Sequence, residues 1–380
     1  MDVLMVLLFS IVAGILPMVL YAVILWWFDR YEKEPTALLA AAFFWGAVPA
    51  IVFSLIVELI LDYPIRQFVD PAAADLIGAA MIAPLAEESF KGAALLLMMI
   101  LFRREIDSPL DGIIYGAMVG FGFAAVENIV YFIGSSAEGA EVLGLTVVLR
   151  AVVFGLNHAM FTGFIGLGLA LARASRNVLA KLAFAVVGFV MGIGAHVVHN
   201  LTVSLAEQIW PCLVTFVSAY GGVLFLFGVI IWATIRERGW IVTYLADEVR
   251  RGTLSAEDYE ITGSWFKRMG VRLRALFTGN VRGWWQLGRY YRLATELAFN
   301  KQRLSHFPGE QDTQKQILTL REQVRGMKPP APPSAAPEPA SQPAPPAAGR
   351  ARYCAGCGRS YRPSEANLDA CPVCHTPRAG

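Results

Sequence analysis

Long apolar runs separated by short polar loops make up the first 236 residues of the chain. A helix crosses a bilayer with about 20 mostly apolar residues, since each residue adds about 1.5 Å. The pattern therefore predicts an all-α polytopic membrane protein with about seven transmembrane helices. The predicted spans are residues 3–28, 36–61, 75–102, 112–133, 143–172, 180–206 and 211–235.

The charges of the loops predict the orientation. Loops after spans 1, 3, 5 and 7 carry Arg and Lys, whereas loops after spans 2, 4 and 6 carry only Arg66 against five acidic residues. The positive-inside rule then places the N-terminus outside and the C-terminus in the cytoplasm. The first span has no basic leader, so it is predicted to be retained rather than cleaved.

The rest of the chain is more polar and divides into three parts. Apolar residues at three- and four-residue spacing predict cytoplasmic helices. Two of these segments, "SWFKRMGVRLRALF" and "RGWWQLGRYYR", are basic and aromatic, and either an anionic membrane surface or an ordinary soluble bundle accounts for them. The predicted domains are a membrane core at 1–236, a cytoplasmic helical extension at 237–327, a Pro/Ala-rich linker at 328–350 and a zinc ribbon at 351–380.

Four cysteines near the C-terminus have the spacing C-x2-C-x13-C-x2-C. Two such pairs can hold a structural zinc ion in a tetrahedral thiolate site, and so small a module needs the metal to fold. We expect this ribbon to dock a cytoplasmic protein partner. The net charge of +2 gives no reason to expect nucleic acid. The predicted zinc ligands are Cys354, Cys357, Cys371 and Cys374.

Four consecutive predicted spans contain ionisable or amide side chains well inside the apolar run. Each charge at the centre of a bilayer costs about 2.5–3.5 kcal/mol on insertion scales. At about 1.5 Å per residue, Glu87, His158 and His196 come within about two helical turns of the same depth. A shared wet pocket would satisfy them together. The full set is Glu87, Glu88, Lys91, Glu127, Asn128, Arg150, His158, His196, His199 and Asn200.

These side chains permit peptide hydrolysis. A buried carboxylate can act as general base on water, a histidine can position that water, and a His–Asn pair can donate to an oxyanion. Glu87 with Lys91, and His196 with Asn200, are each four residues apart and share a helix face. A structural role, a proton relay or transporter, and a zinc site are the alternatives, although no H-E-x-x-H is present.

The motifs "EESFK" (87–91), "FGFAAVEN" (121–128), "FGLNHAMFTG" (154–163) and "HVVHN" (196–200) together resemble the PrsW-type intramembrane proteases. These belong to the superfamily of CAAX-prenyl endopeptidases and bacterial Abi/CPBP proteins. The resemblance covers about residues 1–240 and implies a glutamate-dependent protease. It implies catalytic roles for Glu87, Glu88, His158, His196 and Asn200, with Lys91, Glu127, Asn128, Arg150 and His199 in support.

The resemblance also implies the setting of the reaction. We expect a bacterial inner-membrane enzyme that cuts a membrane-anchored regulatory protein, such as an anti-sigma factor, near its extracytoplasmic side. We expect no cofactor in catalysis, with catalytic zinc as the alternative because such proteins have been described as metalloproteases. A different class remains open, namely a non-enzymatic scaffold or proton-coupled transporter whose ribbon recruits a partner.

Overall fold

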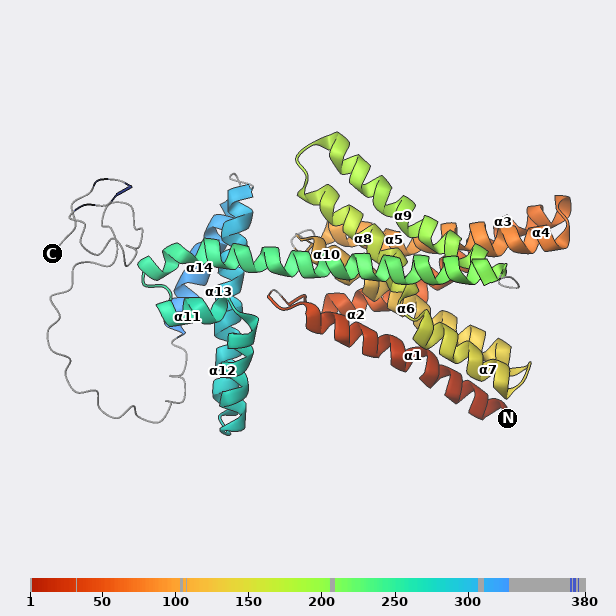
Figure 1. The fold of residues 1–380 in the computed structure, drawn as a ribbon, viewed down its shortest axis with the longest axis horizontal. Helices are drawn as coiled ribbons and strands as arrows, with labels where there is room; N and C mark the ends of the chain where they lie inside the picture. The colour runs from red at the N-terminus through yellow and green to blue at the C-terminus, as the bar shows by residue number, and fades with distance from the viewer. Residues whose placement is uncertain are drawn as a thin grey trace. The chain divides into compact units, whose positions relative to one another are not determined.

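The computed structural model describes residues 2–306, apart from 32, 103–104, 107 and 206–208, and then residues 311–327, 370, 372–373 and 375. The regular elements of this part are all helices (Figure 1). Contacts divide the chain into one unit of residues 1–330 and another of residues 331–380. The predicted zinc ligands lie outside the described residues; they are Cys354, Cys357, Cys371 and Cys374.

Six helices or helical runs of the described chain are long and apolar enough to cross a membrane. Two of these runs contain a π-helical turn, named η1 and η3. They are α1 (Val3–Phe28), α2–η1–α3 (Thr36–Trp45, Gly46–Ala50, Ile51–Phe68), α6 (Pro109–Ser136), α7–η3–α8 (Ala140–Val147, Val148–Val153, Asn157–Ala174), α9 (Val178–Ser204) and α10 (Ile209–Arg250).

The segment predicted as the third span is also helical, but it is not among these six. Its charged side chains at Glu87, Glu88 and Lys91 interrupt an otherwise apolar run. It packs against α3, α6, α8 and α9, so it is an integral part of the bundle. The segment consists of α4 (Pro71–Ile77), a π-helical turn η2 (Gly78–Ile82) and α5 (Ala83–Leu101).

α6 is the central helix of the membrane part, and most of its residues are buried. Gly112, Gly116 and Gly120 repeat at every fourth position, and this glycine face contacts the backbone of α8. A Cβ atom at Gly112 would lie 2.3 Å from the carbonyl oxygen of Gly166, and one at Gly120 would lie 2.3 Å from that of His158. Small residues allow this close helix approach, which sets His158 against α6.

A proline shapes the backbone just before the charged residues of α5. Pro84 has no N–H, so it cannot donate to the carbonyl groups of the preceding turn η2. The amide Nδ2 of Asn200 on α9 donates instead to the carbonyl oxygen of Ala79, at 2.9 Å. This bond joins α9 to the turn η2, directly before α5.

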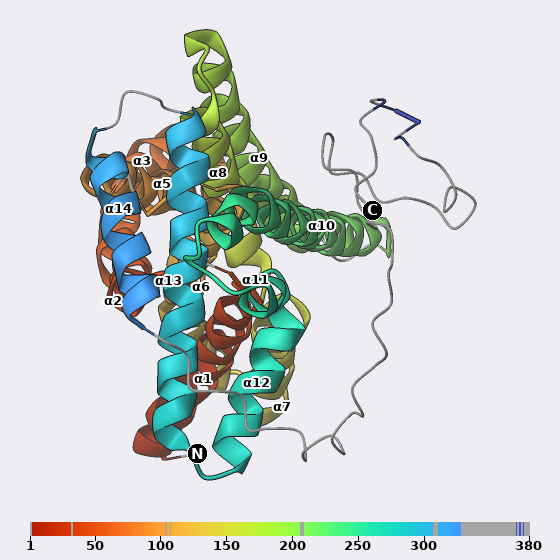
Figure 2. The same ribbon diagram turned by 90° about the vertical axis from the view of Figure 1, so that its left-hand side faces the viewer.

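α10 continues without a break through residue 236, where the apolar pattern ends, and on to Arg250. Its last turns pack against further helices (Figure 2). Glu248 is fully buried there and accepts from Lys301 at 2.8 Å and Arg321 at 2.7 Å. These helices are α11 (Ala256–Thr262), α12 (Trp265–Phe277), α13 (Val281–His306) and α14 (Gln311–Gly326).

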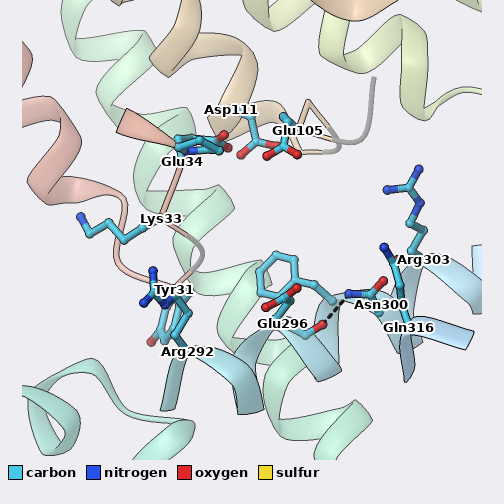
Figure 3. Close-up of a pocket in the computed structure, with 12 residues that line it drawn as sticks. Tyr31, Lys33, Glu34, Glu105, Asp111, Arg292, Glu296, Asn300, Arg303 and Gln316 are labelled. Atoms are coloured by element: carbon cyan, nitrogen blue, oxygen red, sulfur yellow. Dashed lines mark hydrogen bonds between the residues drawn. The ribbon is translucent and has the colours of Figure 1, made fainter. Parts of the chain in front are cut away.

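A polar pocket of about 240 Å³, the junction pocket, lies between the loop after α1, the loop before α6, and α13 (Figure 3). Glu34, Glu105 and Asp111 gather on one side of it, and Arg292 and Glu296 reach it from α13. The pocket therefore contains charges of both signs.

The glycine contacts predict the stability of two variants of α6. Gly112→Ala should lower the stability by about 1–3 kcal/mol, because the added methyl group overlaps the α8 backbone. Gly134→Ala is the matched control, since nothing lies within 4 Å of a Cβ atom there. Thermal unfolding of both variants in detergent tests the prediction, which fails if the two melt at the same temperature.

Candidate active site

The ammonium group of Lys91 lies at the centre of the charged cluster. Its Nζ donates to Glu88 Oε1 at 2.7 Å and to Glu87 Oε2 at 3.0 Å, and it lies 3.1 Å from Nδ1 of His158. Nζ also lies 3.6 Å from the centroid of the Phe123 ring. An ammonium has three N–H groups, so these three partners satisfy it completely. Lys91 is fully buried, and this arrangement makes its burial tolerable.

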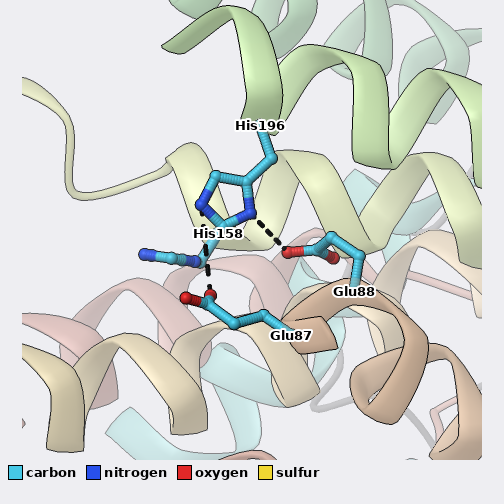
Figure 4. A group of neighbouring side chains, drawn as sticks. All are labelled: Glu87, Glu88, His158 and His196. Carbon is cyan, nitrogen blue, oxygen red and sulfur yellow. Dashed lines mark hydrogen bonds and ion pairs between the residues drawn. The ribbon is translucent and has the colours of Figure 1, made fainter. Parts of the chain in front are cut away.

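Glu88 is also fully buried, and both of its carboxylate oxygens have partners. Figure 4 shows its contact with the ring of His196. Oε1 accepts from Lys91 and lies 3.1 Å from Nδ1 of His196, while Oε2 accepts from the hydroxyl of Thr162 at 2.9 Å. The ring of Phe161 stacks on that of His196 with centroids 4.5 Å apart. Glu88 and Phe161 together fix the orientation of His196, whose Nε2 lies 4.0 Å from Glu87 Oε2.

His158 connects Lys91 to a second group of charges. Since Lys91 can only donate, Nδ1 of His158 accepts and the ring hydrogen is on Nε2. Nε2 lies 2.7 Å from Glu127 Oε2. The same carboxylate forms an ion pair with Arg150 at 2.6 Å, and Arg150 Nε donates to Asn128 Oδ1 at 3.0 Å. Glu127 and Arg150 therefore neutralise each other inside the bundle.

The two predicted residues of α9 that follow His196 do not contact the carboxylates. His199 lies beside Asn157, with Nδ1 3.1 Å from the amide Nδ2, and its ring makes an edge contact with Phe154. Asn200 binds the carbonyl of Ala79, as described above. Both side chains instead line the space next to the cluster.

Two neighbouring cavities border the cluster. The carboxylate cavity, about 470 Å³, lies among α3, η2, α5 and α6. It is lined by Glu87 and by apolar and charged side chains of α3, the charged ones being Glu58, Asp62 and Arg66. The histidine cavity, about 320 Å³, lies among α6, α8 and α9 and is lined by His158, His196 and His199. Glu127 and Asn200 line both cavities. Glu88 and Lys91 line neither.

Some residues of the cluster were missed by the sequence analysis. Thr162 and Phe161 hold Glu88 and His196, and Phe123 lies against Lys91. Thr162 follows His158 by four residues, so it shares a helix face with a predicted site residue, and this spacing could have identified it. The two aromatic residues carry no such signal in an apolar helix.

The cluster also resembles a metal site in its donor set. One ligand atom from each of Glu87, Glu88, His158 and His196 lies within 4.8 Å of the others. Carboxylate oxygens and imidazole nitrogens in this number suit zinc. Lys91, however, contacts three of these four side chains, so a metal ion would compete with its ammonium group for the same atoms.

Removal of the Lys91 charge should destabilise the protein. In Lys91→Met two buried carboxylates lose their cation, and we expect a loss of about 3–5 kcal/mol. Thermal unfolding in detergent measures it, with exposed Lys181→Met as the matched control. The double variant Lys91→Met with Glu88→Gln should recover part of the loss, since one unpaired charge is removed. A wild-type melting temperature for Lys91→Met would contradict this account.

Comparison with known proteins relates this geometry to a family. A family model described as "PrsW family intramembrane metalloprotease" matches residues 34–235, just over half of the 380 residues. "Protease PrsW" of Geobacillus kaustophilus is 26% identical over 233 residues, which cover 60% of this chain and 91% of the relative.

Two further relatives carry the same description. "Protease PrsW" of Clostridioides difficile is 31% identical over 35% of this chain and 53% of its own length. The Bacillus subtilis protein is 29% identical over 40% of this chain and 66% of its own length. No solved structure matches. The family match spans the helices that carry the charged cluster, and the chain belongs to the PrsW family of intramembrane proteases.

Proposed function

We propose that this chain hydrolyses a peptide bond within the membrane with a water molecule activated by Glu87. The observation that carries the proposal is the different setting of the two adjacent glutamates. Glu87 lines the carboxylate cavity, where water and a peptide can reach it. Glu88 is enclosed by Lys91, His196 and Thr162. Glu87 is then the general base, and Glu88 positions its neighbours.

The proton transfers follow from the contacts of Glu87. Lys91 holds Oε2 of this carboxylate, and Oε1 takes a proton from water as the water oxygen bonds to the scissile carbonyl carbon. The same proton passes from Glu87 to the amide nitrogen as the C–N bond breaks. Lys91 keeps the carboxylate in place through both steps, His158 holds the ammonium of Lys91, and Glu127 fixes the ring of His158.

Asn200 and His196 are positioned to stabilise the oxyanion. One N–H of the Asn200 amide is donated to Ala79, and the second is assigned to the carbonyl oxygen of the substrate. Nδ1 of His196 faces Glu88, so Nε2 carries a hydrogen only in the imidazolium form, whose charge Glu88 would balance. Preorganised donors of this kind commonly contribute several kcal/mol to catalysis.

The proposal includes the membrane setting. We infer that the α4–η2–α5 segment is a seventh span, because its charges face the bundle and not lipid. Loop charges support an N-terminus outside and a C-terminus in the cytoplasm of a bacterial inner membrane. A membrane-anchored regulatory protein, such as an anti-sigma factor, is the substrate class that we propose. The zinc ribbon at Cys354, Cys357, Cys371 and Cys374 would recruit a cytoplasmic partner.

A metal-dependent mechanism is the second candidate, because the matching family is described as a metalloprotease. Glu87, Glu88, His158 and His196 would hold the ion, which would supply a Lewis acid and a water of lowered pKa. The contacts of Lys91 with three of these side chains favour the metal-free mechanism.

Glu87→Gln should lower the rate of reporter cleavage by about 10²–10⁴-fold, since the amide cannot accept the proton from water. Glu58→Gln is the matched control, because Glu58 lines the same cavity without joining the Lys91 cluster. The assay follows cleavage of a single-span reporter in detergent. Equal rates for Glu87→Gln and wild type would refute the role of Glu87. Full activity of Glu87→Gln, Glu88→Ala and His158→Ala alike would refute an enzyme at this site.

Chelation distinguishes the two mechanisms. A variant with serine at all four ribbon cysteines should lack the ribbon's zinc, so any remaining metal would belong to the membrane part. We expect its cleavage rate to survive EDTA and elemental analysis to find well under about one metal ion per chain. Loss of activity with EDTA, restored by zinc at about one ion per chain, would instead establish the metal mechanism.

A further inference from the structure

A pocket rich in tryptophan and arginine is lined by other residues than the two cavities beside Glu87. This aromatic–basic pocket has a volume of about 440 Å³ and lies between the end of α1, the loop that follows, α12 and α13. Five of its lining side chains are tryptophans, out of nine in the whole chain. Six others are basic, namely Arg30, Lys33, Arg268, Arg272, Arg289 and Arg292.

The six positive charges have no negative partner among the described residues that line the pocket, since none of these residues carries a carboxylate. The junction pocket differs in this respect, because acidic and basic side chains face each other there (Figure 3). The arginines instead lie over aromatic rings: Arg30 over Trp265 at 4.8 Å and Arg272 over Trp284 at 4.9 Å. Cation–π contacts of this kind orient guanidinium groups but do not neutralise them.

Several buried donors of this pocket have no acceptor. They are Nε1 of Trp26 and the Nε atoms of Arg30, Arg268 and Arg272, which find no hydrogen-bond partner in the described part of the chain. Arg268 is only 8% exposed. Buried N–H groups are seldom left unpaired in proteins, so four in one place indicate a ligand that supplies acceptor oxygens.

Burial of these cations without an anion is unfavourable, and it lowers the pKa of two of the arginines. Burial lowers the pKa of Arg268 to about 10. The pKa of Arg272 is also lowered, first by burial and then by the charge of Arg292. An anion in the pocket would relieve both effects.

The position of the pocket indicates where this anion comes from. Trp26 and Trp27 lie in the last turn of a membrane-spanning helix, and tryptophan is enriched at the level of lipid headgroups. α12 and α13 run across the direction of α10 (Figure 1). Phe266 on α12 is 74% exposed and Trp285 on α13 is 66% exposed. Such side chains suit an interfacial helix pair that inserts into the bilayer surface.

We propose that the aromatic–basic pocket binds the phosphate group of an anionic phospholipid, taken from the leaflet at the C-terminal end of α1. The guanidinium groups of Arg30 and Arg272 present N–H donors that match phosphate oxygens. The terminal nitrogens of Arg268 donate to Thr295 and to the carbonyl oxygen of Arg30, so Arg268 contributes its charge and its unpaired Nε. The bound lipid joins α1 to α12 and α13 and so attaches the helical extension to the membrane. The site is separate from the protease cavities and does not depend on the proposed function.

Lipid binding by the full chain tests the proposal. Delipidated protein in neutral detergent is titrated with short-chain phosphatidylglycerol, with phosphatidylcholine of the same chain length and with inorganic phosphate, and native mass spectrometry counts the bound molecules. Arg272→Gln with Arg289→Gln removes two charges from the pocket. Arg274→Gln with Arg282→Gln removes two exposed charges from the same helices outside the pocket and is the matched control.

We expect one tight phosphatidylglycerol molecule per chain and much weaker binding of the other two probes. The pocket variant should bind phosphatidylglycerol about 30-fold more weakly, and the control should bind as wild type does. Equal binding of phosphatidylcholine, or an equal loss in both variants, would overturn the proposal in favour of non-specific adsorption. Inorganic phosphate that binds as tightly as the lipid would overturn the lipid source.

Discussion

The contacts of the Lys91 ammonium group determine the geometry of the charged cluster. Two glutamates of the same helix, α5, and a histidine of α8 surround this buried cation, and each of its three N–H groups has an acceptor. Without it, adjacent carboxylates would repel each other in a medium of low dielectric constant. Because Lys91 is held from all sides, the positions of Glu87, Glu88 and His158 are set together.

The backbone around this cluster is adapted to hold it. Close packing of α6 on α8 through glycines brings His158 beside the helix that carries Glu127. Pro84 frees the carbonyl of Ala79, which Asn200 then binds. A glycine face and a proline turn, which cost stability in an ordinary helix, here determine where the side chains of the charged cluster point.

Much of this arrangement could be predicted from the sequence. Charged residues inside apolar runs are rare, so their presence indicates a candidate site. Their spacing of four residues correctly predicted the ion pair between Glu87 and Lys91. The contact of His158 with Glu127 could not be predicted, because it depends on the angle between two helices. The length of α10 was also missed, since Arg236 and Arg238 mark the end of the apolar run but do not end a helix.

The continuity of α10 has a mechanical consequence. At about 1.5 Å per residue its 42 residues extend about 63 Å, twice the thickness of the hydrocarbon layer. Its far end is bonded through Glu248 to α13 and α14, and its near part packs on α8 and α9. The peripheral helices are therefore coupled to the helical bundle around the charged cluster by a stiff rod, and neither part can rotate about the rod's axis without straining the other.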